Sequence, residues 1–218
     1  MRIVVLAGGL STEREVSISS GTLVAEALRS KGHEVVLLDV FMGYEENICD
    51  IDALFKQNYS FTDGNSIGDD VENTITNIKE AKENRLDKTS RYIGRNVIEI
   101  CAEADITFLA LHGGEGENGQ LQATLDLFGI KYTGSGYLGS ALAMNKGLTK
   151  SVFMQKNINT PSGELYKNEK DALAWNMFPC IVKPCSGGSS VGVSKVENAD
   201  QYKNCLLYTS PSPRDMRR

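Results

Sequence analysis

A lysine followed by a loop of glycines and serines has the clearest chemical potential in this sequence. Lys183 ends the short apolar run Cys180–Val182, and Pro184 after it cannot continue a hydrogen-bonded strand. The loop that follows offers hydroxyl donors and closely approachable backbone N–H groups from Ser186, Gly187, Gly188, Ser189 and Ser190. Alternating valines predict a second strand over residues 191–194. The pattern therefore predicts strand, loop and strand around a nucleotide-phosphate site.

The same loop has a simpler interpretation. It is not a Walker loop, because no Gly-Lys-Ser or Gly-Lys-Thr follows and no helix opens behind it. A surface β-hairpin whose glycines only form the turn would have the same pattern, and such hairpins are more often structural than functional. Lys183 at the base of the loop is what favours a binding role, so the rest of the sequence must decide.

Composition limits the class of protein. The chain has 218 residues, of which 41% are hydrophobic and 23% charged, enough for one large or two small globular domains. A net charge of −5 argues against a nucleic-acid partner. The apolar run Ile3–Ala7 is too short for a signal peptide or a membrane span, which predicts a cytoplasmic protein without membrane attachment. Five cysteines without a Cys-x-x-Cys pair, and only two histidines, argue against a zinc site.

The first forty residues predict a βαβ unit. Ile3–Ala7 is an apolar strand ended by two glycines, a helix is expected over about 17–31, and Glu34–Val40 is a second strand. This order favours a doubly wound parallel sheet in the α/β class, which binds ligands at the carboxyl ends of its strands. The loop over residues 10–17 lies at that edge.

Two glutamates in this loop have different interpretations. Thr12 and Glu15 have the spacing of a capping box, and a carboxylate is favourable near a helix N-terminus. Glu15 is therefore assigned to the cap. Glu13, at the mouth of the sheet, is better placed to meet a substrate ammonium.

Residues 41–96 are weakly patterned. Residues 75–83 could form a polar helix or part of a mobile segment, no chemistry is assigned, and an insertion of this kind is expected to be a surface elaboration. Order returns with a helix at Val97–Ala102, a strand at Asp105–Leu111, a Gly-rich loop at His112–Gly119 and a helix at Gln120–Phe128.

His112 begins the Gly-rich loop at the carboxyl end of a predicted strand. A histidine in this place favours a functional role, although a hydrogen bond to a backbone carbonyl is a fair alternative. After a short strand at Ile130–Thr133, residues 137–156 are predicted to be helical with a break near Gly147. This helix carries Lys146, and helical lysines are usually solvated.

Taken together, these motifs resemble the D-alanine–D-alanine ligases of the ATP-grasp superfamily. The matching stretches occur in the family's order and are Gly8–Ser17, Ala110–Gly113, Glu117–Gly119, Tyr132–Gly136, Ser140–Lys146, Ile181–Pro184 and Gly188–Gly192. The resemblance covers roughly residues 1–45 and 97–204, and the co-occurrence of many motifs makes it far more specific than any one of them.

The resemblance implies a role for each matching residue. Glu13 matches the acid that holds the ammonium of the first D-alanine, and His112 matches the histidine beside that substrate's carboxylate. Lys146 and Lys183 match the lysines that contact ATP. The loop over residues 186–190 matches the lid over the phosphates, in which Ser189 matches the serine of the acidic residue's hydrogen-bond network.

The implied reaction is ATP-dependent ligation of two D-alanines through an acyl phosphate, for peptidoglycan precursors. ATP with Mg²⁺, D-alanine and a homodimer belong to the same expectation. Two departures from the family pattern concern loop closure, namely Asn145 in place of the usual aspartate and Gly-Gly-Glu-Gly after His112. The alternatives are a D-alanine–D-lactate or D-alanine–D-serine ligase, and a stand-alone nucleotide-binding module.

The expected architecture has three parts. Residues 1–139 form a doubly wound, pre-ATP-grasp domain on the substrate side, and residues 140–205 form an incomplete ATP-grasp domain. Residues 206–218 are a Pro/Ser-rich, basic tail outside the family pattern, which is expected to be unstructured or an artefact of the sequence. No metal ligand is assigned, because the family's magnesium-binding residues are expected beyond the matched part. The 218-residue chain by itself is therefore expected to be inactive.

Overall fold

The computed structural model describes residues 1–48, 50–62, 71–166, 168–188 and 192–208. The chain divides into two compact units, Met1–Ala141 and Leu142–Arg218. Among the described residues, no helix combines the length and the apolar character needed to cross a bilayer.

A parallel sheet of three strands forms the centre of the first unit. Its order is β2-β1-β3, with β1 at Arg2–Ala7, β2 at Glu34–Asp39 and β3 at Ile106–Leu109. In the register, Val4 lies opposite Val36 on one side and Thr107 on the other. Both faces of the sheet are covered, which is why β1 and β2 are almost continuously apolar. The α/β class and the parallel sheet predicted from the sequence are confirmed.

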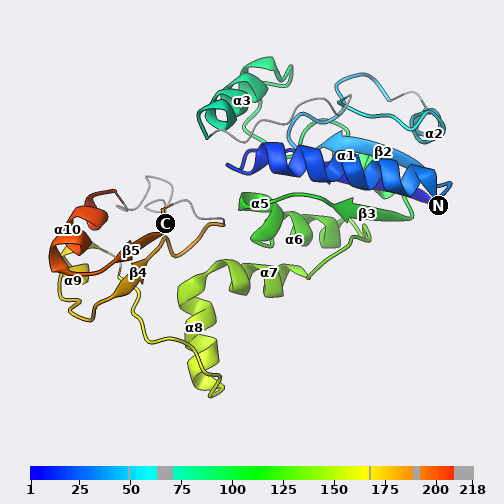
Figure 1. Ribbon diagram of the computed structural model, residues 1–218. Coiled ribbons are helices and arrows are strands. Elements are labelled where there is room, and N and C mark those ends of the chain that lie inside the picture. The colour runs from blue at the N-terminus through cyan, green and yellow to red at the C-terminus, as the bar shows by residue number, and fades with distance from the viewer. Residues whose placement is uncertain (49, 63–70, 167, 189–191, 209–218) are drawn as a thin grey trace. The chain divides into compact units, whose positions relative to one another are not determined.

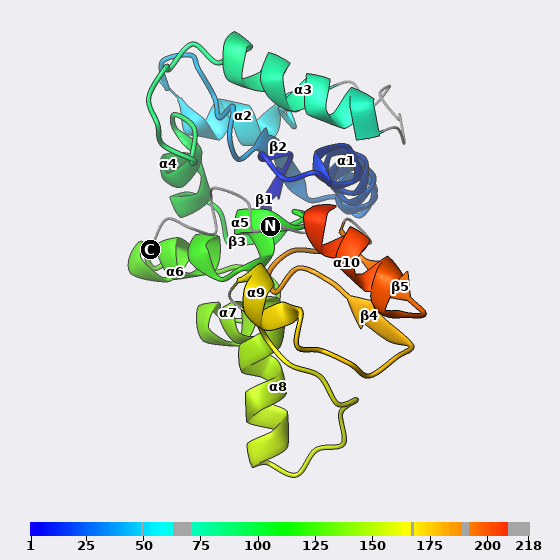
Figure 2. The same cartoon turned by 90° about the vertical axis from the view of Figure 1, so that its left-hand side faces the viewer.

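Helices cover the two faces of this sheet with separate cores. Helix α1 (Arg14–Ser30) packs through Ala25 on the odd-numbered residues of β1, whereas α4 (Val97–Ala102) and α6 (Gln120–Leu127) pack on the even-numbered ones. Figure 2 shows α1 on one side of the sheet and α4 and α6 on the other. The carboxyl ends of β1 and β3 therefore emerge between two helical layers.

Helix α1 begins three residues earlier than predicted. Its N-cap is Glu13, which makes no side-chain capping hydrogen bond, so the predicted capping box of Thr12 and Glu15 is wrong. Glu15 lies in the first turn, where its carboxylate is favourable to the helix dipole. The helix can begin early because Ser11 accepts a hydrogen bond from the Glu13 N–H through its side-chain oxygen.

Elements after β3 are shorter than the pattern indicates. The Gly-rich loop after His112 contains a single helical turn, α5 (Gly114–Glu117), between glycines of positive φ. Residues 130–133 do not form a strand of their own, because only Tyr132 pairs with Thr107, in one parallel bridge.

Several described residues of the segment 41–96 belong to the core, so the segment is more than the surface elaboration that was expected. Helix α2 (Ile51–Lys56) is capped by the Asp50 carboxylate, which accepts from the Ala53 N–H at 3.1 Å, and its Phe55 is 0% exposed. Helix α3 (Val71–Asn84) confirms and extends the helix considered for 75–83. The apolar residues of this segment come in short stretches that all contribute to the same core cluster. No single helical or strand period therefore runs through the segment.

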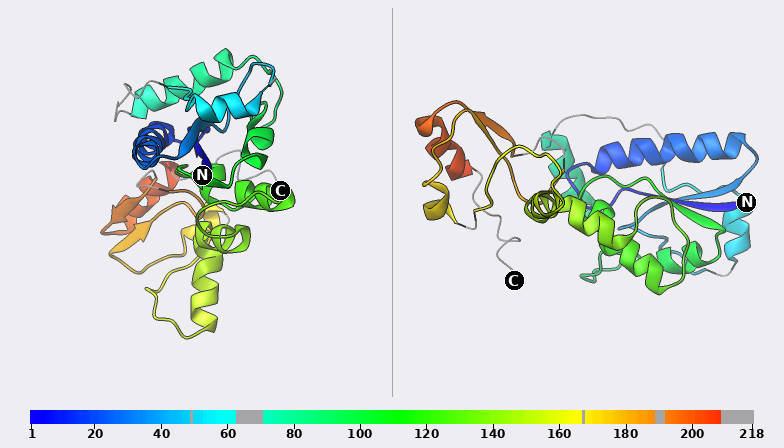
Figure 3. Two further views of the ribbon diagram at one scale, coloured as in Figure 1. Left: turned by 90° about the vertical axis from the view of Figure 1, so that its right-hand side faces the viewer. Right: turned by 90° about the horizontal axis from the view of Figure 1, so that it is seen from below.

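The second unit is built from an interrupted helix and a β-hairpin (Figures 1 and 3). Helix α7 (Tyr137–Met144) leads into it, and α8 (Lys146–Gln155), α9 (Glu169–Ala172), β4 (Cys180–Val182), β5 (Ser194–Val196) and α10 (Ala199–Tyr208) follow. Strands β4 and β5 are antiparallel, with Cys180 opposite Val196. The hairpin predicted around the Gly/Ser loop is confirmed, although its second strand begins only at Ser194.

Two boundaries in this unit differ from the prediction. The helical break falls at Asn145, not near Gly147, because Asn145 is extended and its side chain accepts from the Leu148 N–H at 3.0 Å to cap α8. Helix α10 continues through Tyr208, so residues 206–208 are helical and not part of an unstructured tail. Residues 209–218 lie outside the described part of the chain.

Candidate functional site

The loop after β1 is fixed by a buried carboxylate from the end of β2. Asp39 is 0% exposed, and its Oδ1 accepts hydrogen bonds from the N–H groups of Gly9 at 3.2 Å, Phe41 at 2.8 Å and Met42 at 3.2 Å. Gly8 has φ +73, and a Cβ there would lie 2.3 Å from Asp39 Oδ2. The carboxylate can reach the loop only because a glycine stands at this position.

Arg14 completes this arrangement from the first residue of α1. Its Nη2 pairs with Asp39 Oδ2, and its Nη1 donates to the Gly9 carbonyl at 2.6 Å. A buried charge is tolerated only when it is paired and hydrogen-bonded, and both charges meet that condition. The ion pair therefore fastens the β1 loop to the end of β2. Sequence reasoning missed it, although a charged residue after the apolar run Val35–Leu38 was a usable signal.

Two serines, Ser17 in α1 and Ser11 in the loop before it, connect the loop to the end of β3. Ser17 Oγ accepts from the Gly8 N–H at 2.9 Å and donates to the Ala110 carbonyl at 2.8 Å. Ser11 Oγ donates to the His112 carbonyl at 2.5 Å. The carboxyl ends of β1 and β3 are therefore held side by side, as a parallel sheet with ligands at that edge requires.

Glu13 and His112 meet at this edge, as their positions in the sequence predict. Gly113 has φ +67, and a Cβ there would lie 2.6 Å from Glu13 Oε2, so the carboxylate rests against the residue that follows His112. The His112 ring nitrogen Nε2 lies 3.1 Å from Ser20 Oγ. The ring is thus oriented by a hydroxyl, not by the backbone carbonyl of the alternative interpretation. A carboxylate and an imidazole in this arrangement can meet the two charged ends of an amino acid.

Lys146 is held against the Gly/Ser loop in the second unit. As the first residue of α8, it donates from Nζ to the Gly187 carbonyl at 2.7 Å, and its backbone N–H donates to the Cys185 carbonyl at 3.0 Å. The Cys185 thiol donates to Asn145 Oδ1 at 3.2 Å. The capped start of α8 and the base of the loop therefore form one hydrogen-bonded group. The structure thereby joins two predicted site residues that lie 41 positions apart.

The other described residues around the loop are exposed or half-buried. Lys183, Ser186 and Gly187 are exposed, and Gly188 is half-buried. Gly187 has φ +124, and a Cβ on it would meet nothing within 4 Å, so this backbone is open to a ligand. Ser189 and Ser190 lie outside the described residues. A cation beside open glycine backbone suits a nucleotide phosphate.

The described residues contain no group of three or more His, Cys, Asp or Glu side chains that could hold a metal ion.

Two family models match the chain. The model described as "D-ala D-ala ligase N-terminus" matches residues 2–135, and the model described as "D-ala D-ala ligase C-terminus" matches residues 142–211. The chain belongs to the D-alanine–D-alanine ligase family. The resemblance noted from its motifs is thereby confirmed, and the family's models account for residues in both units.

Curated relatives agree with the family models. A "D-alanine--D-alanine ligase" of Lacticaseibacillus casei is 42% identical over 209 residues, which are 94% of this chain and 57% of that protein. The protein of the same name from Pediococcus pentosaceus is 43% identical over 210 residues, which are 94% of this chain and 58% of that protein. The chain thus spans less than two thirds of the length of these relatives.

Solved structures share the fold. The D-alanine–D-alanine ligase of Helicobacter pylori matches with a TM-score of 0.60 and 26% identity, over 95% of this chain and 59% of that chain. The Bacillus anthracis ligase, in a crystal structure complexed with ATP, matches with a TM-score of 0.58 and 27% identity, over 96% of this chain and 52% of that chain. These structures support the placement of the present chain in the ATP-grasp class of folds.

Proposed function

We propose that this protein acts as a D-alanine–D-alanine ligase, which joins two D-alanines with ATP for the synthesis of peptidoglycan precursors. The observation that carries the proposal is family membership over both units, combined with the hydrogen bond between Lys146 Nζ and the Gly187 carbonyl. Residues 1–139 would be the substrate-side domain and residues 140–205 the first part of the ATP-grasp domain. The division into units between Ala141 and Leu142 supports this assignment.

The first D-alanine is assigned to the edge of the sheet. The Glu13 carboxylate would pair with the substrate ammonium, and the imidazole of His112 would contact the substrate carboxylate. The support is geometric: Glu13 rests against Gly113, and Ser11 and Ser20 fix the His112 backbone and ring. An amino acid held by both ends presents its carboxylate in a single orientation, which lowers the entropic barrier to reaction.

ATP is assigned to the second unit, and the Mg²⁺ expected with it is assigned no ligand in this chain. Lys146 and Lys183 would contact the phosphates, and the loop over residues 186–190 would cover them. Ser189 is proposed as a catalytic residue of this loop on the resemblance alone. The residues present fit a phosphate group, since Lys146 is held at an open glycine backbone. A fixed ammonium there stabilises charge that develops on a transferring phosphoryl group, and a closed loop excludes water from an acyl phosphate.

The ATP site is tested by removing one cation. We expect Lys146→Met to weaken ATP binding by about tenfold or more, because a charge-assisted hydrogen bond contributes about 1.5–3 kcal/mol. Lys150→Met is the matched control. Lys150 lies one turn further along α8 and donates to the Pro161 carbonyl, away from the loop. Isothermal titration of both variants with ATP measures the difference, and equal affinities would contradict the assignment.

The activity is tested by joining residues 1–205 to the remaining C-terminal part of the L. casei relative. D-alanine-dependent ADP release with D-alanyl-D-alanine as product would support the ligase. Competition between D-alanine, D-lactate and D-serine, followed by product analysis, would separate the two alternative ligases. A wild-type chain that binds neither ATP nor D-alanine would contradict the proposal.

The family resemblance also leads us to propose a cytoplasmic homodimer. Sedimentation equilibrium of the purified protein tests the oligomeric state, and a monomer at all concentrations would contradict it.

A further inference from the structure

Tyr92 lies against the loop that leads to the D-alanine site, although it comes from the segment to which the sequence assigned no chemistry. A Cβ on Gly9 would lie 2.5 Å from Tyr92 Oη, so the hydroxyl touches the loop where a side chain is missing. The backbone of Leu10 makes a hydrogen bond to the same phenol, which acts to lower its pKa. The ring is anchored in the core cluster that contains β1 and β2. Tyr92 therefore contacts the backbone immediately before Ser11.

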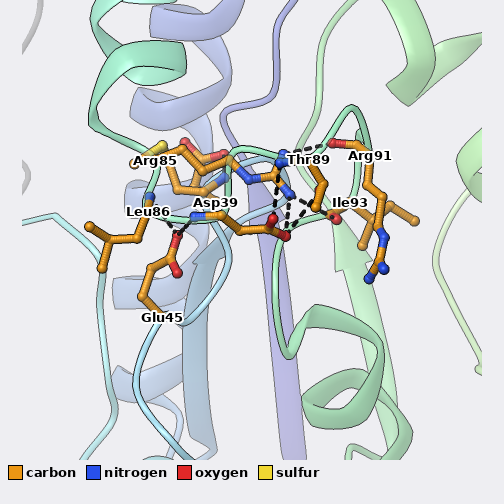
Figure 4. Close-up of polar contacts among 9 residues, drawn as sticks. Asp39, Glu45, Arg85, Leu86, Thr89, Arg91 and Ile93 are labelled. Atoms are coloured by element: carbon orange, nitrogen blue, oxygen red, sulfur yellow. Dashed lines mark hydrogen bonds and ion pairs between the residues drawn. The ribbon is translucent and has the colours of Figure 1, made fainter.

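The residues before and after Tyr92 are held by a buried arginine, and Figure 4 shows Arg85 with Arg91 and Ile93. Arg85 is 1% exposed and donates from Nη1 to the Arg91 carbonyl at 2.6 Å and from Nη2 to the Ile93 carbonyl at 3.4 Å. Its guanidinium lies 4.5 Å from the centre of the Phe41 ring. Burying a guanidinium is costly unless its donors are used, so the carbonyls before and after Tyr92 are strongly constrained.

The phenol is kept neutral. Burial raises the pKa of Tyr92, and the negative charge of Glu115 raises it further, so that the hydroxyl remains protonated over the physiological range. A neutral phenol can accept a hydrogen bond from the loop while it adds no charge near the carboxylates of Glu115 and Asp39. Tyr92 therefore acts here by holding the backbone in position and not by changing the charge.

We propose that Tyr92 is a positioning residue for the first D-alanine. Its hydroxyl fixes the backbone of Gly9 and Leu10, and Arg85 holds Tyr92 in the position that this requires. Displacement of Leu10 would shift Ser11, whose hydroxyl accepts from the Glu13 N–H at 3.1 Å and donates to the His112 carbonyl. Tyr92 thus acts through Ser11 on both proposed substrate contacts. The inference rests on the proposed function for the identity of the ligand.

The test compares the loss of two hydroxyl groups from the same segment. Tyr92→Phe keeps the ring and removes the contact with the loop. Tyr59→Phe removes a hydroxyl from the same core cluster, where Tyr59 packs edge-to-face on Tyr44 at 5.1 Å. The dissociation constants of D-alanine and of ATP are measured on the 218-residue chain by titration, and amide hydrogen exchange is followed at residues 10–13.

For Tyr92→Phe we expect D-alanine binding to weaken by about three- to tenfold, as for the loss of one hydrogen bond, with ATP binding unchanged. We also expect faster exchange at residues 10–13 in this variant and wild-type exchange there in Tyr59→Phe. Unchanged D-alanine affinity and unchanged exchange in Tyr92→Phe would overturn the inference. So would equal effects of the two substitutions, because they would indicate a general loss of stability.

The two proposals fail in different ways. If the wild-type chain bound no D-alanine, the proposed function would be contradicted, while exchange at residues 10–13 would still decide whether Tyr92 orders the loop. If the wild-type chain bound D-alanine and Tyr92→Phe bound it equally well, only the role of Tyr92 would be lost.

Discussion

The two units position their proposed site residues by opposite means. In the first unit, Glu13 and His112 stand on loops that are fastened by a buried ion pair, Arg14 with Asp39, and by serines that bridge β1 and β3. In the second unit, Lys146 lies at the capped end of a surface helix and is tied to one carbonyl of an exposed loop. A small zwitterion needs a fixed frame, whereas a loop over a nucleotide has to open and close.

The two units also differ in how many of their apolar side chains are buried. The first unit has core clusters on both faces of its sheet. Among the described residues of the second unit, the buried hydrophobic side chains are Ala172, Val196 and Tyr202, and large ones such as Leu148, Met154 and Leu165 are more than half exposed. We therefore attribute most of the chain's stability to the first unit, and the predictions below test how that unit holds its residues in place.

The largest effect is expected from the buried ion pair. Asp39→Ala removes the acceptor for Arg14 and for three backbone N–H groups, which leaves a buried guanidinium without its counter-charge. The free energy of unfolding of the first unit should fall by about 3–5 kcal/mol. Urea denaturation followed by circular dichroism measures it. Asp52→Ala is the matched control, because the ion pair of Asp52 with Arg2 is open to solvent and should contribute far less to stability. Similar losses of unfolding free energy in both variants would contradict the claim that burial makes the Arg14–Asp39 pair important for stability.

A smaller effect is expected at the contact between Glu13 and Gly113. Gly113→Ala places a methyl group where Glu13 Oε2 now lies, and D-alanine binding should weaken by about tenfold, or about 1.4 kcal/mol. Gly134→Ala is the control for backbone strain. Gly134 also has positive φ, at +105, but a Cβ there meets nothing within 4 Å. Both variants should lose about 1 kcal/mol of stability, and only the first should lose affinity. Titration with D-alanine distinguishes them, and equal affinities would remove Glu13 from the site.

The smallest effect concerns pH. Burial raises the pKa of the Cys101 thiol in the first unit from 9.0 to about 12, so the unfolded chain loses this proton first as the pH rises. The stabilisation that comes from this pKa difference is therefore fully present below pH 9.0 and is lost as the pH rises toward the pKa of Cys101 in the folded chain. Between about pH 9 and about pH 10, the free energy of unfolding should fall by about 1 kcal/mol more in the wild type than in Cys101→Ala. Urea denaturation at each pH measures the free energy of unfolding of both proteins. The same dependence on pH in the wild type and in Cys101→Ala would contradict this prediction.

Much of the fold could be predicted wherever the pattern of apolar residues in the sequence matches the burial of those residues in the structure. β1 and β2 are covered on both faces and therefore appear as apolar runs, and α4 begins and ends where its apolar residues do. The segment over 41–96 could not be predicted because its decisive residue is a buried arginine. Besides its ion pair with Asp87, Arg85 donates to two backbone carbonyls, which leave no trace in the sequence.

In the candidate site, too, some residues could be predicted from the sequence and others could not. Glu13, His112 and Lys146 could be proposed as site residues because they belong to motifs that resemble a family. The groups that position them could not, because each depends on a contact between distant residues, such as Arg14 with Asp39 or Tyr92 with Gly9. Such contacts follow from the register of β1 with β2 and from the path of residues 85–95, which only the fold supplies.

The division of substrates between the two units is tested most directly by amide hydrogen exchange of the wild-type chain with D-alanine alone and with ATP alone. We expect D-alanine to slow exchange at residues 8–14 and 112–114, and ATP to slow it at residues 146–148 and 183–188. Protection of the same residues by both ligands, or of the sheet edge by ATP alone, would contradict the assignment of one substrate to each unit.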